Sequence, residues 1–170
     1  METIKTIHKR RSVRQFDTTK TISDADLQTI LHAGMTTPSA MNKQPWEFIV
    51  ITDDDKKVAI AGFSQYAQMT PESPLSILVC GNTKTAFAGH QVEDCSAAIQ
   101  NLMLSATALG IGSVWTGIGA EDRARYDNFV SLFELPEHIQ PIGLIVFGYP
   151  VNDFEERDYF DAKKVHLNKW

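Results

Sequence analysis

The longest periodic stretch of the sequence runs from Gln91 to Leu109, and it constrains the fold more than any other feature. Apolar residues recur there at intervals of three and four, the spacing that places side chains on one face of an α-helix. These residues are Val92, Cys95, Ala98, Ile99, Leu102, Met103, Ala106 and Leu109. Small residues lie off this face at Ser96, Ala97, Ser105 and Ala108. We therefore predict a helix of about 19 residues, ~28 Å long at 1.5 Å per residue, that is buried nearly all round.

Helical patterns and short apolar runs alternate along the rest of the chain. The helical patterns cover residues 3–11, 23–34, 54–61 and 120–133, and the strand-like runs cover residues 48–51, 75–80, 111–115 and 142–147. In the second of these helices, Ser23 and Asp26 resemble a capping box and Gly34 is a natural stop. Such alternation fits a doubly wound parallel sheet and equally an α+β fold. The residues alone leave both open.

Composition indicates one globular domain and excludes several classes of partner. The chain has 170 residues, 43% hydrophobic and 22% charged, and a net charge of -5, which argues against a broad nucleic-acid surface. The first ten residues lack the apolar core of a secretory signal, and no run approaches the ~18 apolar residues of a membrane span. Cys80 and Cys95 lack C-x-x-C spacing and fit two buried, reduced thiols. These features predict a cytoplasmic protein without membrane contact.

Several familiar catalytic motifs are missing from the sequence. The five histidines have no H-E-x-x-H or C-x-x-C companions, which disfavours a metal site, and Ser39 has no G-x-S-x-G elbow. The glycines of G-I-G at residues 110–112 do not make a dinucleotide fingerprint, because Trp115 stands where G-x-G-x-x-G requires glycine. We expect Trp115 in the core.

The stretch from Thr36 to Trp46 has more special chemistry than a plain connector. Pro38 and Pro45 push the residues before them out of the helical region, so we expect an extended, stiff backbone. Between the prolines stand hydrogen-bonding side chains, and an aromatic plane follows them; they are Ser39, Asn42, Lys43, Gln44 and Trp46. This set suits a flat ligand with polar edges. The alternative is an ordinary surface loop.

A second unusual stretch, His8 to Phe16, gathers three arginines around Ser12 in an acidic protein; they are Arg10, Arg11 and Arg14. Guanidinium groups bind phosphate through paired, charge-assisted hydrogen bonds. A planar cofactor that carries a phosphate would use both stretches. The alternative for Arg14 is a surface ion pair with Asp17 or another acidic residue.

Four motifs in order along the chain resemble the nitroreductase family of FMN-dependent oxidoreductases. They are R-R-S-V-R at 10–14, P-S-A-M-N-K-Q-P-W at 38–46, G-I-G-S-V-W-T-G at 110–117 and K-V-H-x-N-K-W at 164–170. The resemblance covers essentially the whole chain. It implies an α+β fold with a mostly antiparallel sheet of four or five strands flanked by helices, as a domain-entwined homodimer. Residues 1–170 would form a single FMN-binding domain, with 151–170 as a tail wrapping the partner subunit.

The resemblance also implies where FMN would be held. Arg10 and Ser12 match phosphate contacts, Arg11 adjoins them through its backbone, and Lys163 or Lys164 matches a basic residue that completes the phosphate site. Arg14 matches a cation near the flavin pyrimidine, with Asn42 and Gln44 as hydrogen-bonding neighbours of that edge. The other matching positions are Pro38, Ser39 and Ala40, which reach over the flavin of the other subunit, and Thr116 and Gly117, whose backbone N–H groups face flavin N5 and O4.

The function implied by the resemblance is hydride transfer from NAD(P)H through FMN to a flat acceptor, such as a nitroaromatic or a quinone, by a ping-pong mechanism. No side chain needs a catalytic role, because flavin N5 carries the chemistry. Two alternatives remain, namely an FMN-binding storage or sensor protein without significant turnover and a cofactor-free dimeric interaction module. Nothing in the sequence selects the acceptor or chooses between NADH and NADPH.

Overall fold

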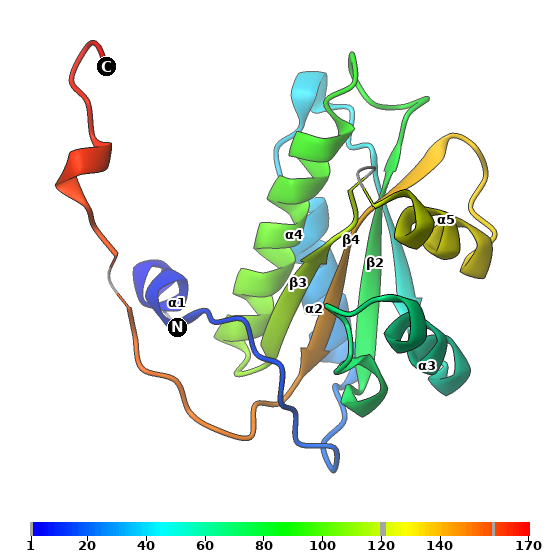
Figure 1. Cartoon of the computed structure of the whole chain (residues 1–170). Helices are drawn as coiled ribbons and strands as arrows, with labels where there is room; N and C mark the ends of the chain where they lie inside the picture. The colour runs from blue at the N-terminus through cyan, green and yellow to red at the C-terminus, as the bar shows by residue number, and fades with distance from the viewer. Residues whose placement is uncertain (1, 120–121, 158) are drawn as a thin grey trace.

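The computed structural model describes residues 2–119, 122–157 and 159–170. Its centre is a four-stranded sheet of β1 (Trp46–Ile51), β2 (Leu75–Asn82), β3 (Gly112–Gly117) and β4 (Ile139–Gly148). The strand order is β1-β2-β4-β3, and every neighbouring pair is antiparallel (Figure 1). The antiparallel α+β prediction is therefore confirmed, and the doubly wound parallel alternative is wrong.

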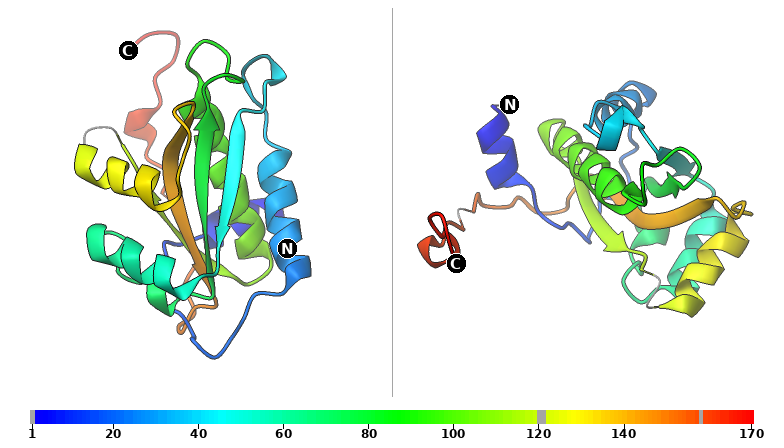
Figure 2. Two further views of the ribbon diagram at one scale, coloured as in Figure 1. Left: turned by 90° about the vertical axis from the view of Figure 1, so that its right-hand side faces the viewer. Right: turned by 90° about the horizontal axis from the view of Figure 1, so that it is seen from above.

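Helices cover both faces of this sheet (Figure 2). They are α2 (Asp24–Met35), α3 (Asp54–Phe63), α4 (Gln91–Ala108) and α5 (Arg123–Leu132), while α1 (Thr3–Lys9) lies to one side of the sheet, beside α4. Side chains alternate across the strands, so Ile77 and Val79 of β2 pack on the α2 and α4 side while Leu78 and Cys80 pack on the α3 and α5 side. The sheet thus separates two hydrophobic cores.

The predicted central helix is present as α4, but its burial is one-sided in a single chain. Cys95, Ala98, Ile99 and Leu102 are fully buried, whereas Val92 is 50% exposed. The expectation of burial nearly all round is therefore not met by one copy of the chain. The start of the predicted helix 120–133 lies partly outside the described residues, and α5 itself begins at Arg123 after the N-cap Asp122.

Gly34 does not end α2, contrary to the prediction, because the helix continues to Met35 and is capped by Thr36. Its role is close packing. A Cβ at Gly34 would lie 2.7 Å from Leu102 Cδ2 of α4 and 3.3 Å from Phe48 Cζ of β1. The other end of α2 is as predicted, since Ser23 Oγ accepts from the backbone N of Asp26 at 3.1 Å.

We expect Gly34→Ala to lower the free energy of unfolding by about 1–2 kcal/mol. The overpacking cost of about 1–3 kcal/mol exceeds the gain of up to about 1 kcal/mol in helix propensity, because Leu102 is fully buried and cannot move aside. Gly62→Ala in α3 is the matched control, since a Cβ there meets nothing within 4 Å, and it should be neutral or stabilising. Urea denaturation of both variants measures the difference, and equal stabilities would contradict the packing role of Gly34.

The C-terminal segment leaves the body of the molecule as an extended tail beside α1 (Figure 1). Arg157 N donates to His8 O at 3.1 Å, and Lys5 Nζ lies 4.0 Å from Glu156 Oε1. All described residues of 151–170 are exposed, and a short 3-10 turn spans Ala162–Lys164. Several are large and apolar, namely Tyr159, Phe160, Val165, Leu167 and Trp170. These side chains stay largely exposed to solvent in a single chain.

Candidate functional site

The arginine-rich segment runs from the end of α1 along the edge of β3. Arg10 caps α1, and Ser12 forms a parallel bridge with Ser113. Val13 N donates to Ser113 O at 2.9 Å, and the buried Val13 side chain packs against Gly112, where a Cβ would lie 2.8 Å from it. Ser12 and Arg14, on either side of Val13, are exposed. This alternation turns polar groups outward along the segment that borders β3.

Arg10 and Arg11 differ in how their guanidinium groups are used. Arg11 Nη1 donates to His8 O and Arg10 O at 2.7 Å each, and Arg11 Nη2 donates to Glu155 O of the tail. Arg11 therefore ties the end of α1 to the tail. Arg10 is half-buried, and among the described residues no acceptor binds its guanidinium.

The loop that follows α2 is a compact turn, so the predicted extended backbone is wrong. A 3-10 turn spans Ala40–Asn42, and the left-handed region holds Met41, Asn42 and Gln44, with φ of 50°, 54° and 49°. Ser39 accepts two bonds that close the turn, from Gln44 N to its Oγ at 2.8 Å and from Asn42 N to its O at 2.9 Å. Gln44 is out of the right-handed helical region, as Pro45 requires, but it is not extended.

Asp94 anchors this turn to the first turn of α4. Its Oδ1 accepts from Ala40 N at 2.9 Å, while its Oδ2 is buried and finds no donor among the described residues. The side chains of Asn42 and Gln44 point to one another, with Nε2 of Gln44 3.3 Å from Oδ1 of Asn42. Pro38 is exposed beside them.

A cavity of about 550 Å³ opens beside β3, and we call it the basic cavity. It is lined by Arg14, Gln65, Tyr66, Gln68, Met69, Trp115, Thr116, Gly117 and Arg125. None of these described lining residues is acidic. The structure therefore brings together three residues that the sequence had placed at one site, Arg14, Thr116 and Gly117, and adds a guanidinium that it had not.

A second cavity of about 450 Å³, the apolar cavity, meets the basic cavity at Trp115 and Gly117, which line both. Its other lining residues are Val92, Ser96, Ile118, Gly119, Tyr126, Gln140, Pro141 and Ile142. The prediction that Trp115 lies in the core is wrong, because it is 38% exposed. Its indole lies over Gly143, where a Cβ would be 2.4 Å from Nε1. Glycine at 143 leaves the space that the indole occupies beside β4.

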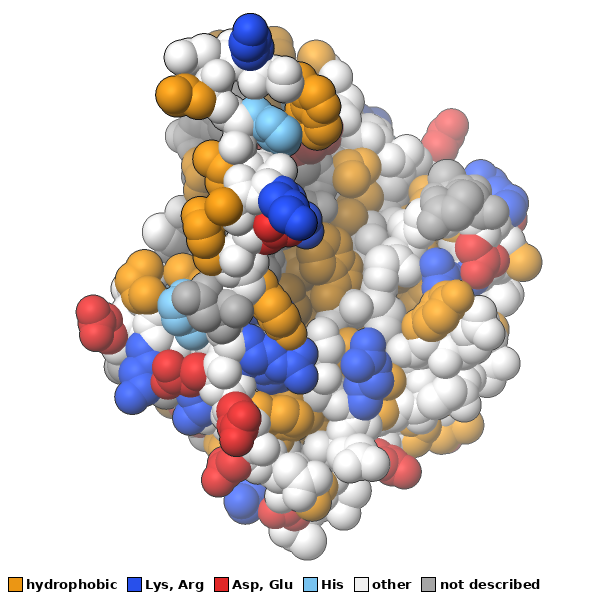
Figure 3. Space-filling view, turned by 60° about the vertical axis from the view of Figure 1, so that its left-hand side comes forward, with side chains coloured by type: hydrophobic (Ala, Val, Ile, Leu, Met, Phe, Trp, Pro, Cys, Tyr) orange, Lys and Arg blue, Asp and Glu red, His pale blue; other side chains and the backbone are white. Residues whose placement is uncertain are grey.

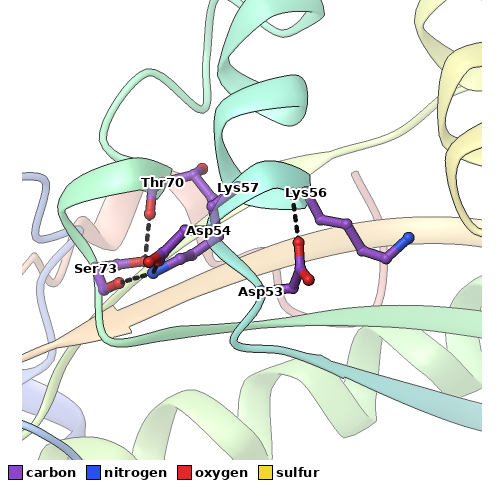
Figure 4. Close-up of polar contacts among 6 residues, drawn as sticks. All are labelled: Asp53, Asp54, Lys56, Lys57, Thr70 and Ser73. Atoms are coloured by element: carbon purple, nitrogen blue, oxygen red, sulfur yellow. Dashed lines mark hydrogen bonds and ion pairs between the residues drawn. The ribbon is translucent and has the colours of Figure 1, made fainter.

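The loop between α3 and β2 forms one wall of the basic cavity and is held from beneath by Lys57 (Figure 4). Lys57 Nζ donates to Ser73 O at 3.0 Å and pairs with Asp54 Oδ1 at 2.8 Å. Within the loop, Ser73 Oγ donates to Thr70 O at 2.7 Å. These contacts therefore fix the loop that lines the basic cavity from Gln65 to Met69.

One chain does not gather all the predicted cofactor contacts. The turn around Asn42 lies where β2 ends, since Asn82 N donates to Pro45 O at 2.7 Å, whereas Arg14 lies in the basic cavity. Figure 1 shows the two stretches apart. Lys163 and Lys164 are exposed in the tail, away from the body of the molecule. Figure 3 shows a hollow between tail and body, with Lys and Arg side chains gathered at its margin.

The two cysteines are free and buried, as predicted. Burial is the main cause that raises the pKa of Cys80 and of Cys95, each to about 12. Both thiols therefore stay protonated at neutral pH. The described residues include no group of three or more His, Cys, Asp or Glu that could hold a metal ion. Among them, no helix has both the length and the apolar character needed to cross a membrane.

Known proteins resemble this chain along its whole length. The chain matches the nitroreductase family in two overlapping segments, residues 7–77 and 65–149. It is 37% identical over 172 residues to a protein of Methanothermobacter thermautotrophicus that is provisionally assigned as an NADH dehydrogenase/NAD(P)H nitroreductase. That similarity covers 100% of this chain and 88% of the relative.

Solved structures show the same fold. A protein of Parabacteroides distasonis with the same provisional assignment superposes with a TM-score of 0.93 at 33% identity, covering 99% of this chain and 98% of that one. A protein of Desulfovibrio desulfuricans, provisionally assigned as a nitroreductase and solved in complex with FMN, superposes with a TM-score of 0.84 at 25% identity. It covers 100% of this chain and 98% of that chain. The chain therefore belongs to the nitroreductase family of NAD(P)H-dependent flavin oxidoreductases.

Proposed function

We propose that this protein binds FMN, takes hydride from NADH or NADPH, and passes it to a flat acceptor such as a nitroaromatic or a quinone. The observation that carries the proposal is the meeting of the basic and apolar cavities at Trp115 and Gly117. A flat ring with one polar and one apolar edge matches that pair of surfaces. Bound FMN supplies a ring position that accepts and donates hydride, and a single face would serve donor and acceptor in turn.

The chain's own contribution is binding and electrostatics. The described lining of the basic cavity offers guanidinium, amide and hydroxyl groups but no histidine, cysteine or carboxylate, so no acid or base pair is required there. Arg14 would place a positive charge near the pyrimidine edge of bound FMN, where negative charge develops on reduction. Gly117 leaves open space above the strand, because a Cβ there would meet nothing within 4 Å.

The phosphate would bind where α1 ends. The guanidinium of Arg10 has no acceptor in the part of the chain that the structure describes, and Ser12 is exposed next to it on the edge of β3. Lys163 or Lys164 would add a second positive charge. The tail extends away from the body of its own subunit, so we propose that the lysine at each phosphate site comes from the partner subunit. We propose the same origin for Pro38, Ser39, Ala40, Asn42 and Gln44.

A domain-entwined homodimer is part of the same proposal. Val92 on the outer side of α4, Ile4 and Ile7 on α1, and the apolar tail residues are exposed in one chain. A second copy that packs on α4 and is wrapped by residues 151–170 would bury them. Light scattering should then give a mass near 38 kDa, twice the 19.0 kDa of the chain. A mass of one chain would contradict this arrangement.

The absorption spectrum of the purified protein, followed by anaerobic titration with NADH and with NADPH, tests the function. We expect a yellow protein whose flavin absorbance bleaches on addition of one or both nucleotides and returns when a quinone is added. A yellow protein that is not bleached would leave only a storage or sensor role. A colourless protein that takes up no added FMN would overturn the proposal and favour an interaction module.

A further inference from the structure

Arg125 is a buried cation that the proposed function leaves without a task. It lies in the first turn of α5 with only 8% of its surface exposed. Its guanidinium faces the ring of Tyr66, with 5.4 Å between Cζ and the ring centroid. Both side chains line the basic cavity, at the same wall as Gln65 and Gln68. A charged side chain is rarely buried to this extent unless an opposite charge or hydrogen bonds offset the cost of its desolvation.

The compensation within the described chain is incomplete. Arg125 Nε is 3.4 Å from Asp122 Oδ2 but lacks the alignment of a hydrogen bond, and this buried atom has no hydrogen-bond partner among residues 2–119, 122–157 and 159–170. The described residues offer no acceptor to its two Nη nitrogens. Asp122 is itself half exposed, so water screens its charge. With respect to the described residues, the guanidinium therefore brings unpaired donors and an incompletely neutralised charge to the cavity.

We propose that Arg125 is a second cation, beside Arg14, that binds the pyrimidine edge of the flavin and favours its reduced form. The inference rests on the proposed binding of FMN. Arg14 is exposed and its charge is screened by water, whereas the charge of Arg125 lies in a drier, less polarisable place. Two fixed positive charges on one edge stabilise negative charge that appears there only on reduction.

The test is the two-electron midpoint potential of bound FMN in wild type and in Arg125→Gln, together with the Kd of oxidised FMN. We expect the variant to bind reduced FMN about tenfold more weakly relative to oxidised FMN, which is a potential about 30 mV lower for a two-electron couple. Arg125→Lys, which keeps the charge, should lie within about 10 mV of wild type, about a twofold change in that ratio.

Arg123→Gln is the matched control. It removes the same charge from the same helix, but Arg123 is paired with Asp127, its Nε donating to Oδ2 at 3.0 Å, and it lies outside the basic cavity. Its potential should equal that of wild type. Asp122→Asn is a second probe that does not depend on the stability of the arginine variants, since asparagine also caps helices well. Removing this carboxylate should raise the potential.

The outcomes distinguish a failure of FMN binding from a failure of the role proposed for Arg125. A wild-type protein that takes up no FMN overturns both the proposed function and this inference. A yellow wild type whose potential is the same in Arg125→Gln, or equally lowered in Arg123→Gln, overturns the inference alone. Should Arg125→Gln fail to fold, an unchanged potential in Asp122→Asn has the same meaning. A lowered potential in Arg125→Gln, with Arg123→Gln and Arg125→Lys at the wild-type value, supports it.

Discussion

Arg10→Ala is expected to weaken FMN binding about 10- to 100-fold, whereas Arg11→Ala should change it less than about threefold. A charge-assisted hydrogen bond is worth about 1.5–3 kcal/mol, and each 1.4 kcal/mol is a factor of about ten in affinity. Arg10 has a guanidinium that no described residue occupies, at the end of α1 where the phosphate would lie. Quenching of FMN fluorescence on titration with apo-protein measures both dissociation constants.

Arg11 is a stringent control because it carries the same charge one residue further along the chain. Its donors are occupied by the carbonyl groups of His8, Arg10 and Glu155, so it has little left for a phosphate. Losing it should instead remove one of the contacts between the tail and α1, and we expect faster proteolysis after residue 150 in Arg11→Ala. The bond from Arg157 N to His8 O is retained in this variant, so the tail and its lysines should stay docked. Equal losses of FMN affinity in the two variants would show that only the summed charge of the segment matters. That result would remove the specific role of Arg10.

Local patterns were sufficient to predict the elements of the fold. The three-and-four spacing of apolar residues predicted α4 to within one residue of its observed end, and short apolar runs predicted all four strands. The relative direction of the strands could not be predicted from local patterns. Alternating helices and strands are compatible with parallel and antiparallel sheets alike, so the antiparallel order followed from the family resemblance and not from the periodicity.

The errors lie where distant residues decide the local structure. Gly34 is predicted to end a helix because glycine commonly does so, but glycine is needed there because Leu102 of another helix packs against it. The turn around Asn42 reads as extended because of its prolines, but Ser39 and the carboxylate of Asp94 hold it as a left-handed turn. Propensity describes a residue and its neighbours in sequence, and neither contact is visible at that range.

The candidate site was predicted in part for the same reason. Arg14, Thr116 and Gly117 belong to recognisable motifs and do meet at one cavity. Trp115 was predicted to lie in the core because large aromatic residues in strands are usually buried. Glycine at position 143 instead leaves room for its indole at the surface. Arg125 belongs to no motif. The signal that reveals it is a charge at helical spacing from Phe129 and Leu132, on the face of α5 that should be apolar.

Lys57→Met is expected to lower the free energy of unfolding by about 2 kcal/mol and the Tm by about 4–8 °C. Methionine fills most of the space of the lysine stem, but it leaves the buried carbonyl of Ser73 without its donor (Figure 4). Asp54 contributes less, because 89% of its side chain is exposed and its charge is readily rehydrated. Thermal unfolding followed by circular dichroism, at one protein concentration and without added FMN, measures the change.

Lys56→Met makes the same substitution one residue earlier in α3 and should cost less than about 1 kcal/mol. Lys56 Nζ also donates to a carbonyl, that of Leu132 at 3.3 Å, but it lies at the half-buried edge of α3 where water can replace it. A larger loss in Lys56→Met than in Lys57→Met would contradict the role given to the buried ammonium. Because the same ammonium holds the loop that lines the basic cavity, hydrogen exchange of residues 64–74 should accelerate in Lys57→Met well below its Tm. Destabilisation without that local opening would mean that Lys57 supports the fold and not the cavity wall.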